Sequence, residues 1–318
     1  MERDTSNTTP SLMALLLAFA AVYLIWGSTY LGIRFAIETM PPFTMSALRF
    51  LSAGTILFVG STSLGAGWPR AVHWRSAAIV GTLLLVSGNG LLAWAEQFVP
   101  SGVAALIVGT VPLWMVVLDA MGPGGSRPGL AVIAGLVLGL LGIAVLVGPG
   151  ELGGGSVHLG GALAICFAAF SWAVGSLYSR RAPQSSSTLQ NVGMQMLTGG
   201  GILFLVGLGL GERVDFAAVS ARSAWALAYL AIFGGVVSYS AYVWLLKVST
   251  PARVSTYAYV NPVVAVLLGW ALAGEALSPR VFLATVAVVS AVVLISGAKK
   301  PATAEESEDL SGPEGRDR

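Results

Sequence analysis

The sequence predicts an all-α integral membrane protein, with ten transmembrane helices arranged as two inverted five-helix repeats. Three observations predict this fold. The chain of 318 residues is 55% hydrophobic and only 10% charged. Soluble domains, in contrast, carry about 25% charged residues. Ten apolar segments are long enough to cross a bilayer, and the second five match the first five in order.

The composition also excludes several other classes of protein. The net charge is only +2, so no overall field would attract a nucleic acid. A single cysteine, Cys166, excludes an intrachain disulfide. With two His and one Cys, a His/Cys metal site is not expected either. We therefore expect no metal, no cofactor and no nucleic-acid partner.

Each predicted span is close to the length that the hydrocarbon core requires, about 20 mainly apolar residues. The spans cover residues 12–33, 44–60, 76–95, 102–119, 130–148, 159–179, 190–210, 223–246, 254–274 and 281–297. The first is expected to remain as a helix, because its apolar run is too long for a signal peptide. Residues 1–11 are expected to form a tail, and the acidic residues 298–318 a disordered tail.

Lys and Arg predict the orientation of the chain in the membrane. If the N-terminus is inside, twelve of them fall in inner loops and tails and four in outer loops. The remaining one, Arg49, lies within a span. Because Lys and Arg concentrate in cytoplasmic loops, both termini are predicted to be cytoplasmic.

An internal repeat relates the two halves of the chain. A shift of 146 residues aligns Trp26 with Trp172, and a shift of 150 aligns Pro112 with Pro262. The predicted repeats are residues 12–148 and 159–297. Five helices is an odd number, so the second repeat must enter the membrane in the opposite sense. Inverted repeats are typical of secondary transporters, which rock about a site near the bilayer midplane.

Aromatic residues on shared helix faces are the main candidates for the wall of a central cavity. Tyr23, Trp26 and Tyr30 are spaced i, i+3, i+7 and so share one face of the first span. The same kind of spacing in later spans gives the candidates Trp172, Ser176, Tyr239, Tyr242, Tyr257 and Asn261. An aromatic wall suits a ring or a cation. The alternative is that these rings only pack helices together or lie in the interfacial belt.

Glycine-interrupted helices in both halves indicate a central site. Asn89 lies between Gly88 and Gly90 in the third span, and Ser238 follows a glycine pair in the eighth. An amide in lipid must find a partner. It either bonds a neighbouring helix or marks a local break whose carbonyl groups face a polar ligand.

Prolines and further glycines predict bends and close packing. The matched pair Pro112 and Pro262 predicts that both halves bend at the same place, as fixed kinks or gating points. Gly135 and Gly139 form a GxxxG pattern in the fifth span, which favours close helix packing. That packing is either internal or part of a homodimer.

Charged residues within spans are costly and usually functional. Arg49 is the candidate cation for a substrate carboxylate. Its alternative roles are to snorkel to the outer interface or to bond carbonyl groups at a helix end. Glu96 and Asp119 lie at span ends and are expected at the interfaces. No Asp or Glu lies near the middle of a span, which favours facilitated diffusion or coupling through an end carboxylate.

Four short motifs carry a resemblance to a known family. They are WGSTY at 26–30, LRF at 48–50, NPVV at 261–264 and GEALS at 274–278. On these the chain resembles the drug/metabolite transporter superfamily, EamA family, over nearly its whole length. Within it, the chain looks most like YddG-like bacterial exporters of aromatic amino acids and other metabolites. The resemblance implies two EamA repeats, a bacterial inner membrane and export of small metabolites. The Gly274-Glu275 pair has no counterpart in the first half, so we expect its role only once.

These observations predict a transporter and not an enzyme. We expect export of small organic solutes, amino acids including aromatic ones, by alternating access around a midplane cavity. Cationic drugs are the rival substrates, although the lack of a central carboxylate favours zwitterions. Alternatives from other classes are a membrane-embedded transferase and a non-transporting assembly protein. The expected partners are the small-molecule substrate and the lipid bilayer, and a homodimer through helix packing is left open.

Overall fold

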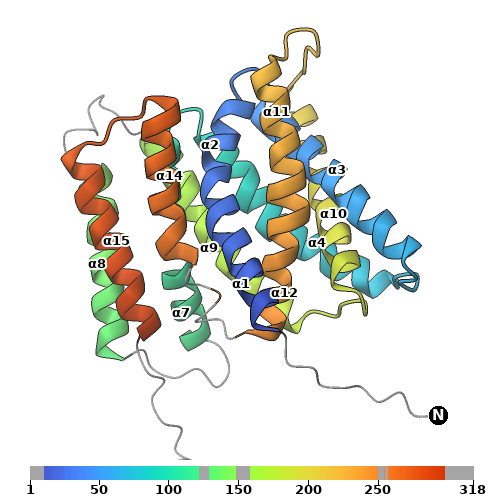
Figure 1. The fold of residues 1–318 in the computed structure, drawn as a ribbon, viewed down its shortest axis with the longest axis horizontal. Coiled ribbons are helices and arrows are strands. Elements are labelled where there is room, and N and C mark those ends of the chain that lie inside the picture. Colours follow the sequence, from blue (N-terminus) through green and yellow to red (C-terminus); the bar gives the residue numbers. More distant parts are fainter. Residues whose placement is uncertain (1–10, 122–128, 148–157, 250–253, 255–256, 298–318) are drawn as a thin grey trace, which may run out of the picture.

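The computed structural model describes residues 11–121, 129–147, 158–249, 254 and 257–297 (Figure 1). All the regular structure within these residues is helical. The predicted tails 1–11 and 298–318 therefore lie, apart from Ser11, outside the described residues.

The helices of the first half follow the predicted spans closely. They are α1 (Leu12–Ala20), η1 (Ala21–Ile25), α2 (Trp26–Ala36), α3 (Pro42–Ser63), α4 (Ala71–Gly81), η2 (Thr82–Gly90), α5 (Leu91–Ala95), α6 (Ser101–Val108), α7 (Val111–Met121) and α8 (Leu130–Val147). The series α1–η1–α2 is one continuous helix, and so is α4–η2–α5.

The second half repeats this arrangement. Its helices are α9 (Leu159–Arg181), α10 (Thr188–Gly209), α11 (Ala221–Tyr229), η3 (Leu230–Tyr239), α12 (Ser240–Val248), α14 (Tyr257–Ala273) and α15 (Pro279–Gly297). The series α11–η3–α12 is again continuous.

The membrane class of the fold is confirmed. Six helices of the described residues are long and apolar enough to cross a membrane: Leu12–Ala36, Pro42–Ser63, Ala71–Ala95, Leu159–Arg181, Thr188–Gly209 and Ala221–Val248. Shorter apolar helices coincide with the other four predicted spans. The ten predicted spans therefore agree with the positions of the helices. Six of the ten also meet the length and hydropathy of a membrane span in the structure.

The helices form a row of packed pairs (Figure 1). α8 and α15 pack together at one edge, and α3 packs along α10 at the other. α2, α9 and α14 lie between these edges. Gly139 and Gly142 of α8 approach Ala291 and Ala287 of α15, where an added Cβ would lie 3.4 and 3.0 Å from the alanine Cβ atoms. The close packing predicted for this glycine-rich helix is therefore internal, and it gives no support to a homodimer.

Among the described residues, three helices contain a π-helical segment at mid-length. These segments are η1, η2 and η3. In π geometry the backbone bonds run to the fifth residue and not the fourth, which leaves some carbonyl groups poorly paired. Side chains of other helices compensate. Ser238 Oγ donates to the carbonyl oxygen of Ala21 (3.1 Å), Ser171 Oγ to that of Leu83 (2.9 Å) and Trp26 Nε1 to that of Gly234 (3.2 Å). The glycine-interrupted helices thus depart from α geometry without breaking.

Two Gly-Glu pairs join helices of the two halves. Gly211 and Gly274 end α10 and α14 with φ of 77° and 68°, a conformation that glycine adopts readily. Glu212 and Glu275, which follow them, extend their carboxylates to the N-termini of α3 and α6. The expectation that this motif acts only once was wrong, because Gly211-Glu212 repeats it within the second half.

Each of these carboxylates accepts three hydrogen bonds. Glu212 accepts from the backbone N–H groups of Phe43 (3.1 Å) and Thr44 (2.7 Å) and from Thr44 Oγ1 (2.7 Å). Glu275 accepts from the N–H groups of Ser101 (2.8 Å) and Gly102 (3.0 Å) and from Ser101 Oγ (2.6 Å). The first N–H groups of a helix have no partner within it, and its dipole favours a negative charge there. Both carboxylates therefore stabilise contacts between the halves.

Candidate functional site: a ring-lined cavity between the halves

A cavity of about 60 Å³ lies where helices of both halves meet. Nine of the residues predicted from the sequence contribute to its wall: Trp26, Tyr30, Arg49, Gly88, Asn89, Trp172, Tyr239, Tyr257 and Asn261. They come from α2, α3, η2, α9, η3 and α14. The structure thus brings together residues that lie up to 235 positions apart in the chain.

Five aromatic rings form a continuous cluster at this wall, which we call the five-ring cluster: Trp26, Trp172, Tyr239, Tyr242 and Tyr257. Trp26 is its centre. Its ring centroid lies 5.7 Å from Trp172, 6.4 Å from Tyr239, 4.9 Å from Tyr242 and 5.7 Å from Tyr257. The contacts are tilted or edge to face, the arrangements that aromatic pairs prefer. The cluster presents an apolar wall with a few hydroxyl groups.

Two hydroxyl groups of the cluster have partners within the protein. Tyr239 Oη donates to Gln195 Oε1 (2.9 Å), and the hydroxyls of Tyr242 and Ser176 share a hydrogen bond of 2.9 Å. Tyr242 and Ser176 line a second, smaller cavity of about 10 Å³ and not the main one. Tyr257 belongs to the walls of both cavities.

The other predicted residues lie outside the main wall. Tyr23 stacks against Phe19, with ring centroids 5.7 Å apart. Ser238 is fully buried and bonds the carbonyl of Ala21. At Gly90 an added Cβ would meet Leu203 at 2.6 Å, so this glycine allows close packing.

The two predicted bends differ between the halves. Pro112 is the second residue of α7, just after the interruption at residues 109–110 that separates it from α6. Pro262 lies inside α14, which continues through it. The described residues therefore show an interruption at the first proline and a continuous helix at the second. A gating role for Gly88, Gly90 and the two prolines stays a prediction.

The two amide side chains satisfy π-helical carbonyl groups. Asn89 Nδ2 donates to the carbonyl of Leu84 in its own helix (3.3 Å). Asn261, with its amide nitrogen turned toward η1, donates to the carbonyl groups of Tyr23 (2.9 Å) and Val22 (3.2 Å). Both residues also border the cavity, so they shape its wall while they hold backbone in place.

Arg49 is the one charged residue among those that line the main cavity. Its side chain is only 4% exposed, so it does not snorkel to the interface. The guanidinium lies 4.8 Å from the ring centre of Phe50, and Nε has no hydrogen-bond partner in the described residues. Gly234 makes room for it, since a Cβ there would lie 2.9 Å from Nη2. The structure thus places a buried cation at the cavity, with its Nε unpaired within the described residues.

Sequence reasoning did not single out several wall residues as candidates: Thr29, Phe50, Leu92, Val108, Ala168, Ala169 and Gly234. Most are small or aliphatic and resemble any lipid-facing residue in sequence. Thr29 carried the clearest signal, because it lies within the aromatic face of the first span. Its hydroxyl donates to the carbonyl of Trp26 (2.6 Å), so it supports the cluster.

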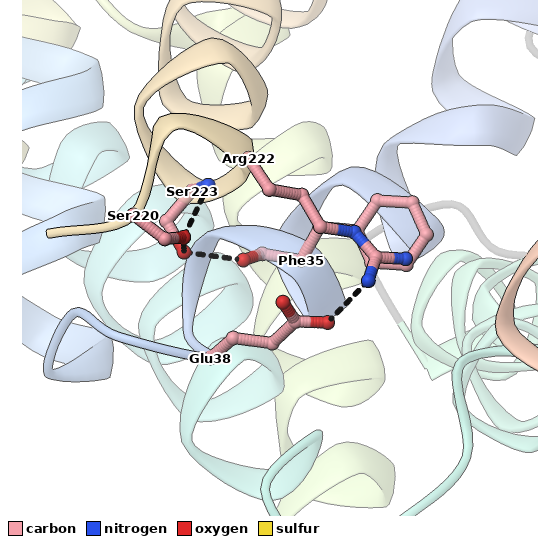
Figure 2. Close-up of polar contacts among 5 residues, drawn as sticks. All are labelled: Phe35, Glu38, Ser220, Arg222 and Ser223. Carbon is pink, nitrogen blue, oxygen red and sulfur yellow. Dashed lines mark hydrogen bonds and ion pairs between the residues drawn. The ribbon is translucent and has the colours of Figure 1, made fainter.

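The ends of α2 and α11 are joined beyond the cavity, at what we call the α2/α11 end of the bundle (Figure 2). Ser223 Oγ donates to the carbonyl of Phe35 (2.8 Å). Arg222 pairs with Glu38 (3.4 Å) and lies 3.7 Å from the ring centre of Phe35. Figure 2 shows the guanidinium of Arg222 between this ring and the carboxylate. The two halves are therefore in contact at this end.

The cavity wall combines aromatic rings with one positive charge. Among the described residues, no group of three or more His, Cys, Asp or Glu side chains could hold a metal ion. The lining residues include no Asp or Glu.

Comparison with known proteins identifies the family of the chain. The model of the EamA-like transporter family matches residues 12–148 and 159–297. The uncharacterized inner membrane transporter YedA of Escherichia coli strain K12 is 39% identical over 306 residues, which cover 94% of this chain and 98% of the relative. Protein PecM of Dickeya dadantii is 25% identical, over 85% of this chain and 88% of PecM.

One solved protein structure has the same overall fold. It aligns with a TM-score of 0.64 at 24% identity, over 90% of this chain and 96% of the solved chain. The family match extends over both halves of the sequence. The chain is therefore a multi-pass membrane protein that belongs to the EamA-like transporter family.

Proposed function

We propose that this protein exports small zwitterionic solutes, amino acids including aromatic ones, by alternating access around the ring-lined cavity. The observation that carries the proposal is that four rings of the five-ring cluster line one cavity together with Arg49, whose Nε has no partner in the described residues. Rings contact an apolar side chain, and a guanidinium binds a carboxylate with two parallel hydrogen bonds.

The cavity is small in this conformation. Its volume of about 60 Å³ has room for only a few water molecules, each of which needs about 10–15 Å³ by this measure. An amino acid is larger, so the halves must separate to admit it. The contacts of Figure 2 close the α2/α11 end, and the distribution of Lys and Arg makes this the outer end. In this orientation both termini are cytoplasmic.

The positive charge of Arg49 in the cavity wall disfavours cationic drugs, the rival substrates. A cationic drug would be drawn to the rings but repelled by the guanidinium of Arg49, which no carboxylate in the wall offsets. A zwitterion brings its own carboxylate. The same cavity therefore favours amino acids over cations.

Counterflow in liposomes tests the proposal. Purified protein is reconstituted with pools of unlabelled amino acids inside, and labelled threonine, methionine or phenylalanine is added outside. Transient accumulation that needs the protein, and that excess unlabelled amino acid abolishes, is the expected result. Accumulation of labelled cations with no signal for any amino acid would contradict the proposed substrate class.

A further inference from the structure

Glu96, the residue that follows α5, is buried although its place at a span end predicted an interfacial position. Its side chain is 0% exposed, and neither carboxyl oxygen has a hydrogen-bond partner in the described residues. Only its backbone carbonyl is engaged, as the acceptor for Arg34 Nη1 (2.7 Å). Glu96 thus follows the last residue of its helix, as expected, but its side chain is enclosed by protein.

Glu96 differs from two other glutamates at helix ends in its hydrogen bonding. Glu212 and Glu275 each accept three hydrogen bonds from a helix N-terminus, so their carboxylates have partners within the protein. Glu96 accepts none in the described residues. Removing an ionised carboxylate from water without such partners is very unfavourable. Burial of Glu96 in this conformation therefore requires a proton or an added positive charge.

The ionisable groups around Glu96 come from three elements. Arg34 and Tyr30 belong to α2, Arg49 belongs to α3, and Glu275 follows α14. The two arginines favour the ionised form, whereas Glu275 opposes it. His158, at the start of the neighbouring helix α9, stacks on Phe98 with ring centres 5.0 Å apart. Burial and, next, the charge of Glu275 outweigh the two arginines and raise the pKa of Glu96 well above its ordinary value.

The position of Glu96 connects it to the cavity. Its backbone N–H donates to the carbonyl of Leu92 (2.9 Å), a residue of the cavity wall one helical turn away. Residues spaced i and i+4 share one helix face. Arg49, in the same wall, lies near enough to act on the Glu96 charge. Glu96 itself is enclosed by protein in this conformation, so a solute reaches both groups only after the halves move.

We propose that Glu96 is the coupling residue of the transporter, a carboxyl group that binds either a proton or the ammonium group of the exported zwitterion. The inference rests on the proposed function. When the α2/α11 end opens, ionised Glu96 takes a proton from water and forms an O–H bond. In the closed state the neutral acid is buried. On the other side, the solute places its carboxylate on Arg49 and its ammonium group on Glu96, and the proton leaves to water. One proton enters for each solute exported.

Proton-driven accumulation is the first test. Liposomes with the wild-type protein carry an interior about one pH unit more acidic than the exterior, with the membrane potential clamped by potassium and valinomycin. Exchange of one proton per solute drives labelled phenylalanine to about tenfold accumulation at steady state. Glu96→Gln, which lacks the anion for the ammonium group, needs a higher phenylalanine concentration for counterflow and only equilibrates the label under the gradient. Glu212→Gln, the matched control, retains the accumulation.

The outcomes separate the two proposals. Loss of counterflow in the wild type would contradict the proposed function. Counterflow without a response to the gradient, or an unchanged response in Glu96→Gln, would overturn the role of Glu96.

Infrared spectroscopy gives a second test that needs no substrate. The protein is titrated with acid and base in lipid, and the C=O stretching band of a protonated carboxyl group without hydrogen bonds is followed. We expect this band in the wild type and in Glu212→Gln, and its loss in Glu96→Gln. Persistence of the band in Glu96→Gln, or its absence from the wild type, would show that Glu96 holds no proton in the closed state.

Discussion

Trp26 and Trp172, which occupy matching positions in the two halves, meet edge to face with ring centroids 5.7 Å apart and planes at 83°. A shift of 146 residues relates them in the sequence. Both residues line the cavity, so equivalent positions of the two repeats touch each other at the candidate site. Relative movement of the halves must therefore alter this contact, and the following predictions start from it.

Removal of the Trp172 ring should weaken substrate binding more than removal of a comparable ring elsewhere. Trp172 lines the cavity, whereas Trp114 packs on Phe170 with centroids 5.4 Å apart and is absent from the wall. Both are half-buried. An aromatic contact contributes about 0.5–1.5 kcal/mol beyond area burial, so Trp172→Ala should lower affinity up to about tenfold. Competition in the counterflow assay measures this, and an equal loss in Trp114→Ala would assign the effect to packing.

Substitution of Arg49 should affect substrates with a free carboxylate selectively. A hydrogen bond to a charged group contributes about 1.5–3 kcal/mol, so Arg49→Gln should weaken phenylalanine by roughly 10- to 100-fold. Phenylalanine amide, a cation without a carboxylate, should compete at least as well against the variant as against the wild type, because Arg49 repels it. Arg49→Lys should restore only part of the affinity, because an ammonium group lacks the planar fork of the guanidinium. Parallel losses for the acid and the amide would exclude carboxylate recognition.

The two carboxylate caps should contribute similarly to stability. Each accepts three hydrogen bonds at a helix N-terminus, so Glu212→Gln and Glu275→Gln should each lower the free energy of unfolding by about 1–2 kcal/mol. Thermal unfolding in detergent measures the change. Glu38→Gln is the control, because its ion pair with Arg222 joins side chains that are 39% and 52% exposed. Exposed pairs contribute at most about 1 kcal/mol.

A reversible bridge across the α2/α11 end should stop transport. Cysteines replace Glu38 and Arg222, whose side chains meet at 3.4 Å, in a Cys166→Ser background. A short cleavable bis-thiol reagent should abolish net flux, and reduction should restore it. Single-cysteine variants treated in the same way should keep their activity. Full flux in the bridged protein would show that these helix ends do not separate during the cycle.

Much of the candidate site could be predicted from the sequence, because rings repeat at helical spacing. Tyr239 and Tyr242 are three residues apart, and Tyr257 and Asn261 are four apart, so one face of each helix was defined before the fold. The second Gly-Glu pair, Gly211-Glu212, is also visible in the sequence. It lies in the same half as Gly274-Glu275, so an alignment of the two halves does not reveal it.

Other features depend on tertiary packing and leave little trace in sequence. Glu96 was expected at the interface because hydropathy reports only on local composition, whereas its burial comes from neighbours such as Arg34 and α9. The ring of Tyr242 contacts that of Trp26, yet Tyr242 does not line the main cavity. Its hydroxyl instead shares a hydrogen bond with Ser176 at the second cavity. Helical spacing gives the direction of a side chain but not the distance to the opposite wall.

The π-helical segments constrain how the chain can change in length. An α-helix turns by about 100° per residue. A π-helical turn contains about one residue more than an α-helical turn, so deletion of one residue from η1 would convert it toward α geometry and leave Leu12–Ala20 and Trp26–Ala36 in nearly the same relative orientation. Deletion of one residue from an α-helical part of the same helix would instead rotate its two ends against each other by about 100°. Either Trp26 would then leave the five-ring cluster, or the apolar face of α1 would turn away from its neighbours. The segments η1, η2 and η3 are therefore the places where these helices tolerate the loss of a residue.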